Sequence, residues 1–373
     1  MALRVAILGL RAPYEVEGGV ELSVGELGPR LAARGCAVTV YCRRRYNRFG
    51  PGMVRGMRLI DTDTVYTRSL EAFVHTLLTT PRASLRADVV HIHAAGPALF
   101  SWLPRLLGSR SVVTIHGLDW KRDKWGPVAR AVLRAGATAA ASFPDRLITV
   151  GSHLRDWFRE HMGVDSSLIP NGVSPIPFEP LERAGVPGLR SKQYLLYLGR
   201  LVPEKGLDRL LNAYRESGID LPLLIVGGDT HMLEFGQRLR SGAPPGVRFT
   251  GPLFGPARDA LLHHARALVQ PSYLEGFPLS PLEALSAGRP VLLSDIAPHH
   301  EQLEGQEGKI GWIVEDTGWA AALRDLARAP DTTLDQMGAA AAEHAAAAFS
   351  WEAAADRHLA LYEDLCQAAR PSS

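Results

Sequence analysis

Short apolar runs alternate with longer amphipathic stretches along almost the whole chain. A strand-length apolar run followed by a helix-length amphipathic stretch is the pattern of a parallel sheet covered by helices, so we predict an α/β fold. The predicted strands of the first half are 4–8, 38–41, 88–91, 111–115 and 146–150, and those of the second half are 194–198, 222–226, 247–249, 267–269 and 290–293.

The alternation restarts near residue 193, after a segment rich in proline and glycine that runs from Pro170 to Gly188. Segments of this composition connect domains, and 373 residues suffice for two. A last amphipathic segment follows Ser350, which fits a helix N-cap, and its apolar face must dock on its own domain or on the first one. We therefore predict two Rossmann-like domains over residues 1–172 and 193–349, a linker over 173–192, and a C-terminal helix and tail over 350–373.

Composition excludes several classes of protein. A formal net charge of +2 argues against a nucleic-acid binder, in which basic charge is concentrated. No apolar run reaches the roughly 18 residues that a membrane-spanning helix needs. The three cysteines, Cys36, Cys42 and Cys366, match no zinc spacing and are too few for a disulfide framework, so we expect a protein of the reducing cytoplasm.

Ligands of open α/β sheets bind beyond the carboxyl ends of the strands, so the residues that follow each strand are the first candidates. Gly18 and Gly19 precede a helix that we expect from about Val20, where backbone amides can approach an anion. An ordinary turn explains the two glycines equally well. Arg200 and Lys205 lie in a loop that joins a strand to a helix, and they are either phosphate ligands or solvated cations.

Two glutamates eight residues apart follow the strand 267–269. Glu275 lies in a loop bounded by glycine and proline, where a carboxylate can meet ligand hydroxyls, and Gly276 permits close backbone approach. Ser280 and Glu283 have the spacing of a capping box with Pro281 at the first helical position, so Glu283 caps a helix, binds a ribose diol, or does both.

His116 directly follows the strand 111–115, and this place favours a functional role over a structural one. His91 and His93 alternate along another strand end without metal-ligand spacing. Asp61 and Asp63 have a spacing that can hold a divalent metal ion, but their polar surroundings favour a turn.

Together these residues resemble the retaining glycosyltransferase family 4 of the GT-B fold, over nearly the whole chain. The motifs are Gly18-Gly19, the run 199–206, the run 275–284, and Phe349-Ser350-Trp351-Glu352 with Tyr362, which is similar to the crossover helix of the family. The segment 114–126 is similar to bacterial members that build cell-surface polysaccharides, including rhamnosyltransferase-like members. Pro278 departs from the glycine that the family often has there and implies a stiffer loop.

The resemblance implies two Rossmann-like β/α/β domains that face a cleft, with the C-terminal helix crossing back to the first domain. It implies that Arg200 and Lys205 neutralise the donor diphosphate, that Glu283 binds the ribose, and that Glu275 and His116 contact the donor sugar. The implied catalytic set is His116, Glu275, Arg200 and Lys205, and the implied donor-binding set is Gly18, Gly19, Gly199, Arg200, Lys205, Glu275, Gly276, Phe277, Leu279 and Glu283.

The expected activity is that of a hexosyltransferase-type enzyme. It would transfer a sugar from a UDP, GDP or dTDP sugar to a glycan or lipid-linked acceptor with retention of anomeric configuration, in cell-surface polysaccharide or glycoconjugate biosynthesis. The fold family implies no metal ion and no other cofactor. The alternatives are a nucleotide-sugar epimerase, a sugar phosphorylase, for which no cofactor lysine is evident, or a non-catalytic nucleotide-sugar-binding protein.

Two basic runs leave the membrane question open. They are Arg43-Arg44-Arg45 with Arg48, and Lys121-Arg122 with Lys124. Each run is either a solvated surface, which is the favoured interpretation, or a contact with anionic lipid. We therefore expect a cytoplasmic protein, with peripheral contact at the inner membrane face as the alternative.

Overall fold

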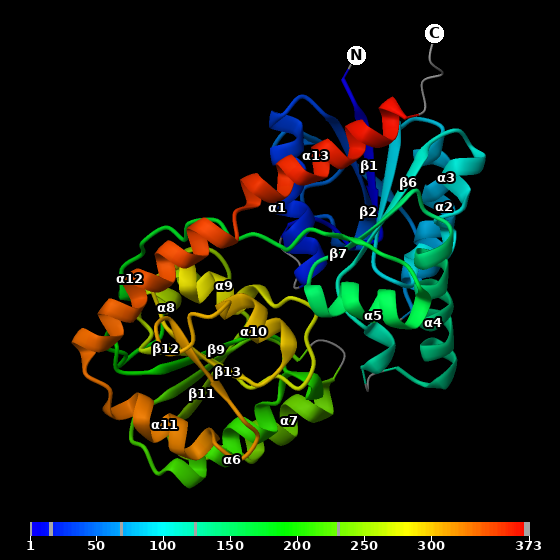
Figure 1. Cartoon of the computed structure of the whole chain (residues 1–373). Coiled ribbons are helices and arrows are strands. Elements are labelled where there is room, and N and C mark those ends of the chain that lie inside the picture. The colour runs from blue at the N-terminus through cyan, green and yellow to red at the C-terminus, as the bar shows by residue number, and fades with distance from the viewer. Residues whose placement is uncertain (1, 15–17, 68–69, 123–124, 230–231, 369–373) are drawn as a thin grey trace. The chain divides into compact units, whose positions relative to one another are not determined.

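The structure, a computed structural model, describes residues 2–14, 18–67, 70–122, 125–229 and 232–368. The chain divides into two compact units (Figure 1). Unit 1 comprises Met1–Gly172 and Trp351–Ser373, and unit 2 comprises Val173–Ser350. The domain boundaries drawn from the sequence stay predictions.

Unit 1 is built on an eight-stranded sheet in the order β3-β4-β2-β1-β5-β6-β7-β8. All neighbouring strands are parallel except β3 and β4. The central strands are almost entirely buried, which matches the continuous apolar runs of a sheet covered on both faces. The strands are β1 Arg4–Leu8, β2 Ala37–Arg43, β3 Gly52–Val54, β4 Met57–Thr62, β5 Val89–His93, β6 Arg110–Ile115, β7 Arg146–Thr149 and β8 Ser167–Leu168.

The helices of unit 1 come from both ends of the chain. Helix α13, drawn in red in Figure 1, packs on α1. The helices are α1 Gly19–Ala33, α2 Glu71–Ser84, α3 Leu103–Leu106, α4 Pro127–Ser142, α5 Ser152–Met162 and α13 Trp351–Gln367, with 3-10 turns η1 Arg44–Tyr46, η2 Pro97–Phe100 and η3 Asp119–Lys121. The predicted return of the C-terminal helix to the first half of the chain is therefore confirmed.

Apolar burial, not charge, holds α13 in place. Arg30 and Arg34 on α1 form ion pairs with Glu352 and Asp356 on α13, at 2.6 to 2.8 Å. The two carboxylate side chains are 61% and 66% exposed, and pairs this exposed contribute about 0–1 kcal/mol each. The other face of α13 buries Trp351, Ala354, Ala355, His358, Tyr362 and Leu365.

Unit 2 is built on a six-stranded parallel sheet in the order β11-β10-β9-β12-β13-β14. One apolar cluster fills the space beside the sheet and includes Tyr197, Leu211 and Trp319. The strands are β9 Leu195–Leu198, β10 Leu223–Val226, β11 Val247–Gly251, β12 Ala267–Gln270, β13 Val291–Ser294 and β14 Gly311–Val314. The helices are α6 Leu207–Ser217, α7 Leu233–Ser241, α8 Pro256–His264, α9 Leu279–Ser286, α10 Ala297–Leu303, α11 Trp319–Arg328 and α12 Asp331–Ala348, with 3-10 turns η4 Leu181–Ala184 and η5 Pro203–Lys205.

Each sheet has a point where the strand order changes direction. In unit 1, β1 lies between β2 and β5, and in unit 2, β9 lies between β10 and β12. A crevice forms at the carboxyl ends of the strands at such a point, because the connections leave to opposite sides. The two candidate ligand regions are therefore the loops after β1 and β5 and the loops after β9 and β12.

The strands of the sequence analysis are all present, with ends that differ by one or two residues. Strands β3, β4, β8 and β14 were not predicted. Strands β3 and β8 are short, at three and two residues, and carry no clear apolar run, whereas β14 has the apolar residues Trp312, Ile313 and Val314 after Gly311 and was missed. Strand β4 includes Asp61, so the prediction that this aspartate lies in a polar turn is wrong.

Candidate functional site

In unit 2 the strand order changes direction at β9, and we call this place the switch point. Two of the predicted residues meet there. Lys205 ends η5 after β9, and Glu275 lies in the loop after β12. The Lys205 Nζ atom is 2.6 Å from the Glu275 Oε1 atom, and the two side chains are only 14% and 8% exposed. The ion pair therefore joins the ends of β9 and β12, where the topology places a ligand crevice.

Glu275 has further polar neighbours from its own loop. The Ser272 hydroxyl donates to Glu275 Oε1 at 2.6 Å, and the Gln270 side-chain amide donates to it at 3.4 Å. Burial by itself raises the pKa of Glu275, but the charge of Lys205 and the hydrogen bonds from Lys205 and Ser272 outweigh it. The pKa of Glu275 therefore lies below its usual range, and the carboxylate is ionised at neutral pH.

Glycine at position 206 lets the lysine loop approach the glutamate loop. Gly206 has a φ of 67°, and a Cβ atom there would lie 2.0 Å from the backbone oxygen of Pro271. Both observations exclude a side chain at this position without a backbone shift. The motif that ends in Lys205-Gly206 thus has a structural reason for its glycine.

Arg200 lies in the same loop as Lys205 and is partly buried. Its backbone oxygen accepts a hydrogen bond of 3.0 Å from the Tyr197 hydroxyl. Burial raises the pKa of Tyr197 well above its usual value, and the charges of Glu275 and Arg200 act on it in opposite directions. Arg200 and Glu275 therefore both lie within electrostatic reach of this one phenol. Gly199 lies close to it too, since a Cβ atom there would be 3.1 Å from the Tyr197 hydroxyl.

The loop after Glu275 turns inward. Gly276 is buried, and the Phe277 ring is 5% exposed and packs 5.7 Å from the Phe349 ring. Pro278 precedes α9, and the Gln302 side-chain amide donates to its backbone oxygen. Leu279 is the first residue of α9. Phe277 is therefore a core residue in this structure, and it fixes the position of the loop.

The predicted capping box at Ser280 is wrong. Helix α9 already begins at Leu279, and its N-cap makes no side-chain hydrogen bond. The Ser280 hydroxyl instead donates to the Gln270 side-chain oxygen at 3.4 Å. The Glu283 carboxylate accepts a hydrogen bond of 2.8 Å from Arg258, on α8.

Arg258 is the residue of this region that the sequence analysis missed. It also donates to Asp259 at 2.8 Å, and its guanidinium is therefore shared by two carboxylates. Burial lowers the pKa of Arg258, but the carboxylates of Glu283 and Asp259 together have a larger opposite effect. The pKa of Arg258 is therefore raised above its usual value. The only sequence signal was an arginine in the first turn of a helix that follows a strand.

In unit 1, the predicted residues lie after β1 and β6. His116 follows β6, and its Nε2 atom is 2.9 Å from the Nδ1 atom of His93, which ends β5. Burial lowers the pKa of His116 to about 4, with a smaller opposing effect from Asp119. Gly18 precedes α1, whose N-cap makes no side-chain hydrogen bond, and a Cβ atom on Gly19 would meet no atom within 4 Å. The carboxylate of Glu21 lies at the same helix end, since a Cβ atom on Gly18 would be 2.0 Å from its Oε2 atom.

The aspartate pair has protein partners. The Asn47 amide donates to Asp61 Oδ1 at 2.6 Å, and Asp63 is 2.9 Å from Arg44. Among the described residues, no group of three or more histidine, cysteine, aspartate or glutamate side chains has the arrangement of a metal site. The three cysteines are free.

The two basic runs are not uniform basic surfaces, because members of each lie close to an acidic side chain. Arg43 is buried and pairs with Glu71 at 3.1 Å, so it is not part of a solvated basic surface. Arg122 is 3.4 Å from Asp119, and Lys124 lies outside the described residues.

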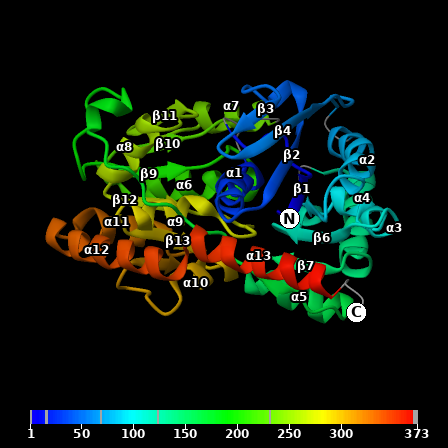
Figure 2. The ribbon, with the colours of Figure 1, turned by 90° about the horizontal axis from the view of Figure 1, so that it is seen from above.

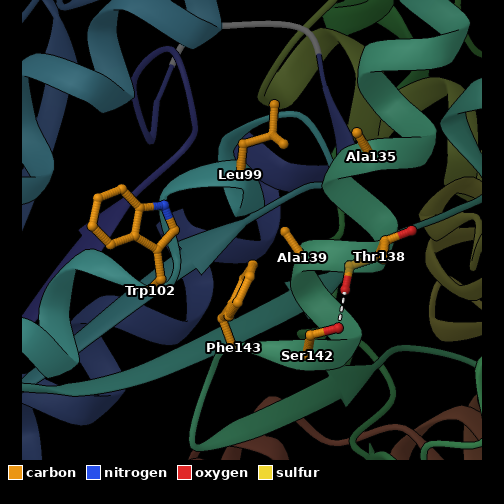
Figure 3. Close-up of a pocket in the computed structure, with 7 residues that line it drawn as sticks. All are labelled: Leu99, Trp102, Ala135, Thr138, Ala139, Ser142 and Phe143. Carbon is orange, nitrogen blue, oxygen red and sulfur yellow. Dashed lines mark hydrogen bonds between the residues drawn. The ribbon is translucent and has the colours of Figure 1, made fainter.

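A surface of unit 1 instead combines exposed apolar and basic side chains. Figures 1 and 2 both show α2, α3 and α4 gathered on one side of the unit. Figure 3 shows a hollow there, in which Leu99, Trp102 and Phe143 face the α4 residues Ala135, Thr138, Ala139 and Ser142. We call the exposed apolar residues of this region the α2–α4 face; they are Leu77, Leu78, Leu85, Trp102, Leu106, Leu107, Val128, Val132 and Phe143.

The exposed charges that helices α2, α3 and α4 add to this face are positive, although Arg105 lies 3.8 Å from the mostly buried carboxylate of Asp145. Arg82, Arg86, Arg105 and Arg134 are exposed around it. Glu71, the single acidic residue in helices α2, α3 and α4, pairs with buried Arg43. Within the described part of the chain, no helix is both long and apolar enough to span a membrane.

Comparison with known proteins agrees with this geometry. Residues 17–175 match the family described as Glycosyltransferase Family 4, and residues 183–344 match Glycosyl transferases group 1. The phosphatidyl-myo-inositol mannosyltransferase of Mycobacterium leprae is 29% identical over 95% of this chain and 96% of its own. The glycogen synthase of Mycobacterium tuberculosis is 30% identical over 75% of this chain and 69% of its own.

Among solved structures, Anabaena HepE in complex with UDP-glucose superposes with a TM-score of 0.78. The match covers 97% of this chain and 100% of that chain at 14% identity, so it shows a shared fold. The narrower resemblance to rhamnosyltransferase-like members stays a prediction. The two parallel sheets, the returning C-terminal helix and the two family matches lead to one assignment. This chain belongs to the family 4 glycosyltransferases of the GT-B fold, enzymes that transfer a sugar from a nucleotide sugar to an acceptor.

Proposed function

We propose that this enzyme transfers a hexose from a nucleoside-diphosphate sugar to a glycan or lipid-linked acceptor, with retention of anomeric configuration. The Lys205–Glu275 ion pair at the ends of β9 and β12 supports the proposal most directly. It puts a cation and a carboxylate at the switch point of unit 2. The diphosphate of a nucleotide sugar can pair with the cation, and its sugar hydroxyls can donate to the carboxylate. UDP-glucose in the related Anabaena structure makes a UDP sugar the first donor to test.

The roles of the residues follow from charge. Breaking the bond between the anomeric carbon and the phosphate oxygen leaves negative charge on the diphosphate and positive character on the sugar. Arg200 and Lys205 stabilise the diphosphate, because fixed cations do not have to reorganise during the reaction. Glu275 and His116 contact the sugar, and Glu283 binds the ribose.

In a single displacement, retention means that the acceptor oxygen attacks from the side that the diphosphate leaves. The new bond joins the acceptor oxygen to the anomeric carbon, and the acceptor proton moves to the departing phosphate oxygen. No side chain is then needed as the base, which fits a site whose carboxylate, Glu275, is held in an ion pair with Lys205.

A panel of UDP, GDP and dTDP hexoses tests the activity. We expect one donor to be hydrolysed slowly without acceptor and faster with a glycan or lipid-linked acceptor, and we expect the product anomer to match the donor anomer by NMR coupling constants. Addition of EDTA is expected to leave the rate unchanged. An inverted product would rule out the retaining mechanism, and isomerised donor would favour an epimerase.

We also propose that the α2–α4 face docks on an anionic lipid bilayer, next to a lipid-linked acceptor on the cytoplasmic side. Two features of the face support this occupant. Nine of the large exposed apolar side chains lie on it, and the exposed charges around it are arginines. Apolar surface that enters the interface and arginines that meet anionic headgroups act together in peripheral membrane binding.

Replacing Trp102 and Phe143 with serine is expected to weaken binding to phosphatidylglycerol vesicles at least tenfold. Each side chain is nearly half exposed in water and would lose its burial in the interface, which is worth about 1.5–3 kcal/mol for a fully buried residue. Vesicle co-sedimentation at low and high salt measures the effect. Leu233→Ser with Phe254→Ser, two exposed positions on unit 2, is the matched control. Equal loss in both variants, or no binding of the unmodified enzyme, would exclude this face.

A further inference from the structure

Three buried histidines, His91, His93 and His358, and buried Tyr362 form a row of ring contacts that leads to His116 in unit 1. His91 and His93 occupy alternate positions of β5, so their side chains point to the same side of the sheet. His358 and Tyr362 lie one turn apart on α13. The ring of His91 is 4.2 Å from that of His93 and 5.7 Å from that of His358, and the ring of His93 is stacked 5.2 Å from that of His116.

Hydrogen bonds tie this row together at both ends. The Tyr362 hydroxyl is 2.7 Å from His91 Nδ1, and His91 Nε2 is 2.6 Å from the Thr114 hydroxyl. His93 Nδ1 is 2.9 Å from His116 Nε2. The other ring nitrogen of His93, Nε2, is buried and has no hydrogen-bond partner.

All four imidazoles are neutral at pH 7. Burial lowers the pKa of His116 and of His358 to about 4, and it lowers the pKa of His91 and His93 well below the usual value. A neutral imidazole carries one N–H group and one acceptor nitrogen. In the contact between His93 and His116, one ring therefore donates and the other accepts.

The unpartnered Nε2 atom of His93 indicates which of the two rings donates the hydrogen bond between His93 and His116. If His116 donated, the proton of His93 would lie on Nε2, and a buried N–H group would have no acceptor. Among buried backbone groups, an N–H group without a partner is rarer than a carbonyl oxygen without one, and we extend the same preference to the ring nitrogens. The favoured arrangement therefore has His93 Nδ1–H donating to His116 Nε2, which leaves the proton of His116 on Nδ1.

We infer that His93 is a positioning residue that fixes His116 as a neutral hydrogen-bond donor through Nδ1. His116 is partly exposed, whereas His93 is 1% exposed, so His116 is the member of the pair that a ligand can reach. A donor at Nδ1 suits an acceptor oxygen, such as a hydroxyl of the donor sugar, and does not suit a general base. This role rests on the proposed function, but the tautomer itself does not.

Helix α13 contributes Tyr362 to the same row of side chains, through its contact with His91. Tyr362 stays protonated, because burial raises the pKa of its phenol far above neutral pH. Its hydroxyl can therefore donate to His91 Nδ1, and His91 then donates from Nε2 to Thr114. The ring of His91 is thereby held by α13 on one side and by β6 on the other.

The test reads the tautomer directly. Long-range proton–nitrogen NMR spectra of the full-length enzyme, labelled with ¹⁵N at histidine, distinguish a protonated from an unprotonated ring nitrogen, and His116→Gln assigns the His116 signals. We expect Nδ1 protonated and Nε2 unprotonated in the free enzyme. A protonated Nε2 would overturn the inference, whether or not any donor sugar is transferred.

Two variants of His93 test its positioning role. His93→Leu is expected to give a mixture of His116 tautomers and to lower kcat/KM about tenfold with the donor that the nucleotide-sugar panel identifies. His93→Asn keeps an N–H group near the position of Nδ1 and is expected to restore the tautomer and most of the rate. His75→Leu is the matched control, because His75 is a buried histidine of the same unit whose pKa is also lowered by burial. Unchanged tautomer and kinetics in His93→Leu, or no rescue by asparagine, would overturn the role of His93.

Discussion

Replacing Lys205 with alanine is expected to lower the rate of sugar transfer about a hundredfold. Removal of one preorganised contact to the charge that develops in the transition state typically costs about 2.7–4 kcal/mol, or a hundred- to thousandfold in rate. Lys205 is held by Glu275 at 2.6 Å before any ligand binds, so it has the preorganisation that this estimate assumes. Steady-state kinetics with the preferred nucleotide sugar measures the loss.

The same substitution leaves a buried carboxylate without its cation, so stability changes with a defined pH dependence. Loss of one partner of a buried ion pair typically costs about 3–5 kcal/mol. In the unmodified enzyme the pKa of Glu275 is below its unfolded value of roughly 4.3, so its contribution to stability is present above that pH and is lost as pH falls through the folded pKa. In the variant, burial without Lys205 raises this pKa, so the free energy of unfolding falls as pH rises above about 4.3. The difference between the two proteins is therefore largest at neutral pH and shrinks towards pH 4.

Denaturant unfolding at pH 7 and near pH 4.5 measures this difference. The double variant Lys205→Ala with Glu275→Gln removes both charges and is expected to regain most of the stability at pH 7 while remaining inactive. Lys192→Ala is the control, because Lys192 pairs with Asp335 in the same unit but the pair is more exposed. It is expected to change the free energy of unfolding by less than about 1 kcal/mol and to leave the rate unchanged. A Lys205→Ala deficit that is equal at both pH values would contradict the buried-charge explanation.

The period of the apolar residues was enough to predict the strands that form the centre of each sheet. Strand β10, and β1 after Arg4, are continuous apolar runs because both of their faces are buried. Strands β3 and β8 lie at the two edges of the unit 1 sheet and are short, so they carry too few residues to show a period.

The contact between Lys205 and Glu275 could not be predicted from the sequence, although each residue was singled out by its place after a strand. The two residues are 70 positions apart, and they meet because β9 pairs with β12. Strand order is a property of the whole sheet, and no local pattern encodes it.

At Glu283 a strong local pattern predicted the wrong hydrogen-bond partner for the carboxylate. The capping box assumed that the helix begins after Ser280, but α9 starts one residue before that serine. The partner of the carboxylate comes from α8, which lies 25 residues away in the sequence. The arginine that faces a carboxylate across two helices has no sequence signature of its own, since basic residues are common in exposed helix turns.

Replacing Glu283 with alanine is expected to lower kcat/KM for the donor by roughly ten- to a hundredfold. Hydrogen bonds to a charged group contribute about 1.5–3 kcal/mol, and the proposed contact to the ribose is of this kind. The effect on stability is expected to be smaller, about 1 kcal/mol, because Arg258 keeps Asp259 as a partner at 2.8 Å. The variant thus separates donor recognition from folding.

Competition by nucleotides shows whether the lost interaction is with the ribose. If Glu283 accepts hydrogen bonds from the diol, the unmodified enzyme binds uridine diphosphate more tightly than its 2′-deoxy or 3′-deoxy form, and Glu283→Ala binds all three with similar affinity. Coupling between the side chain and the hydroxyl group is what a double-mutant cycle measures, and indirect effects through Arg258 weaken all three nucleotides equally. Glu307→Ala, an exposed glutamate of the same unit next to His300, is the control and is expected to keep the preference. A preference for the ribose diol that survives in Glu283→Ala would assign ribose recognition to another residue and leave Glu283 as the structural partner of Arg258.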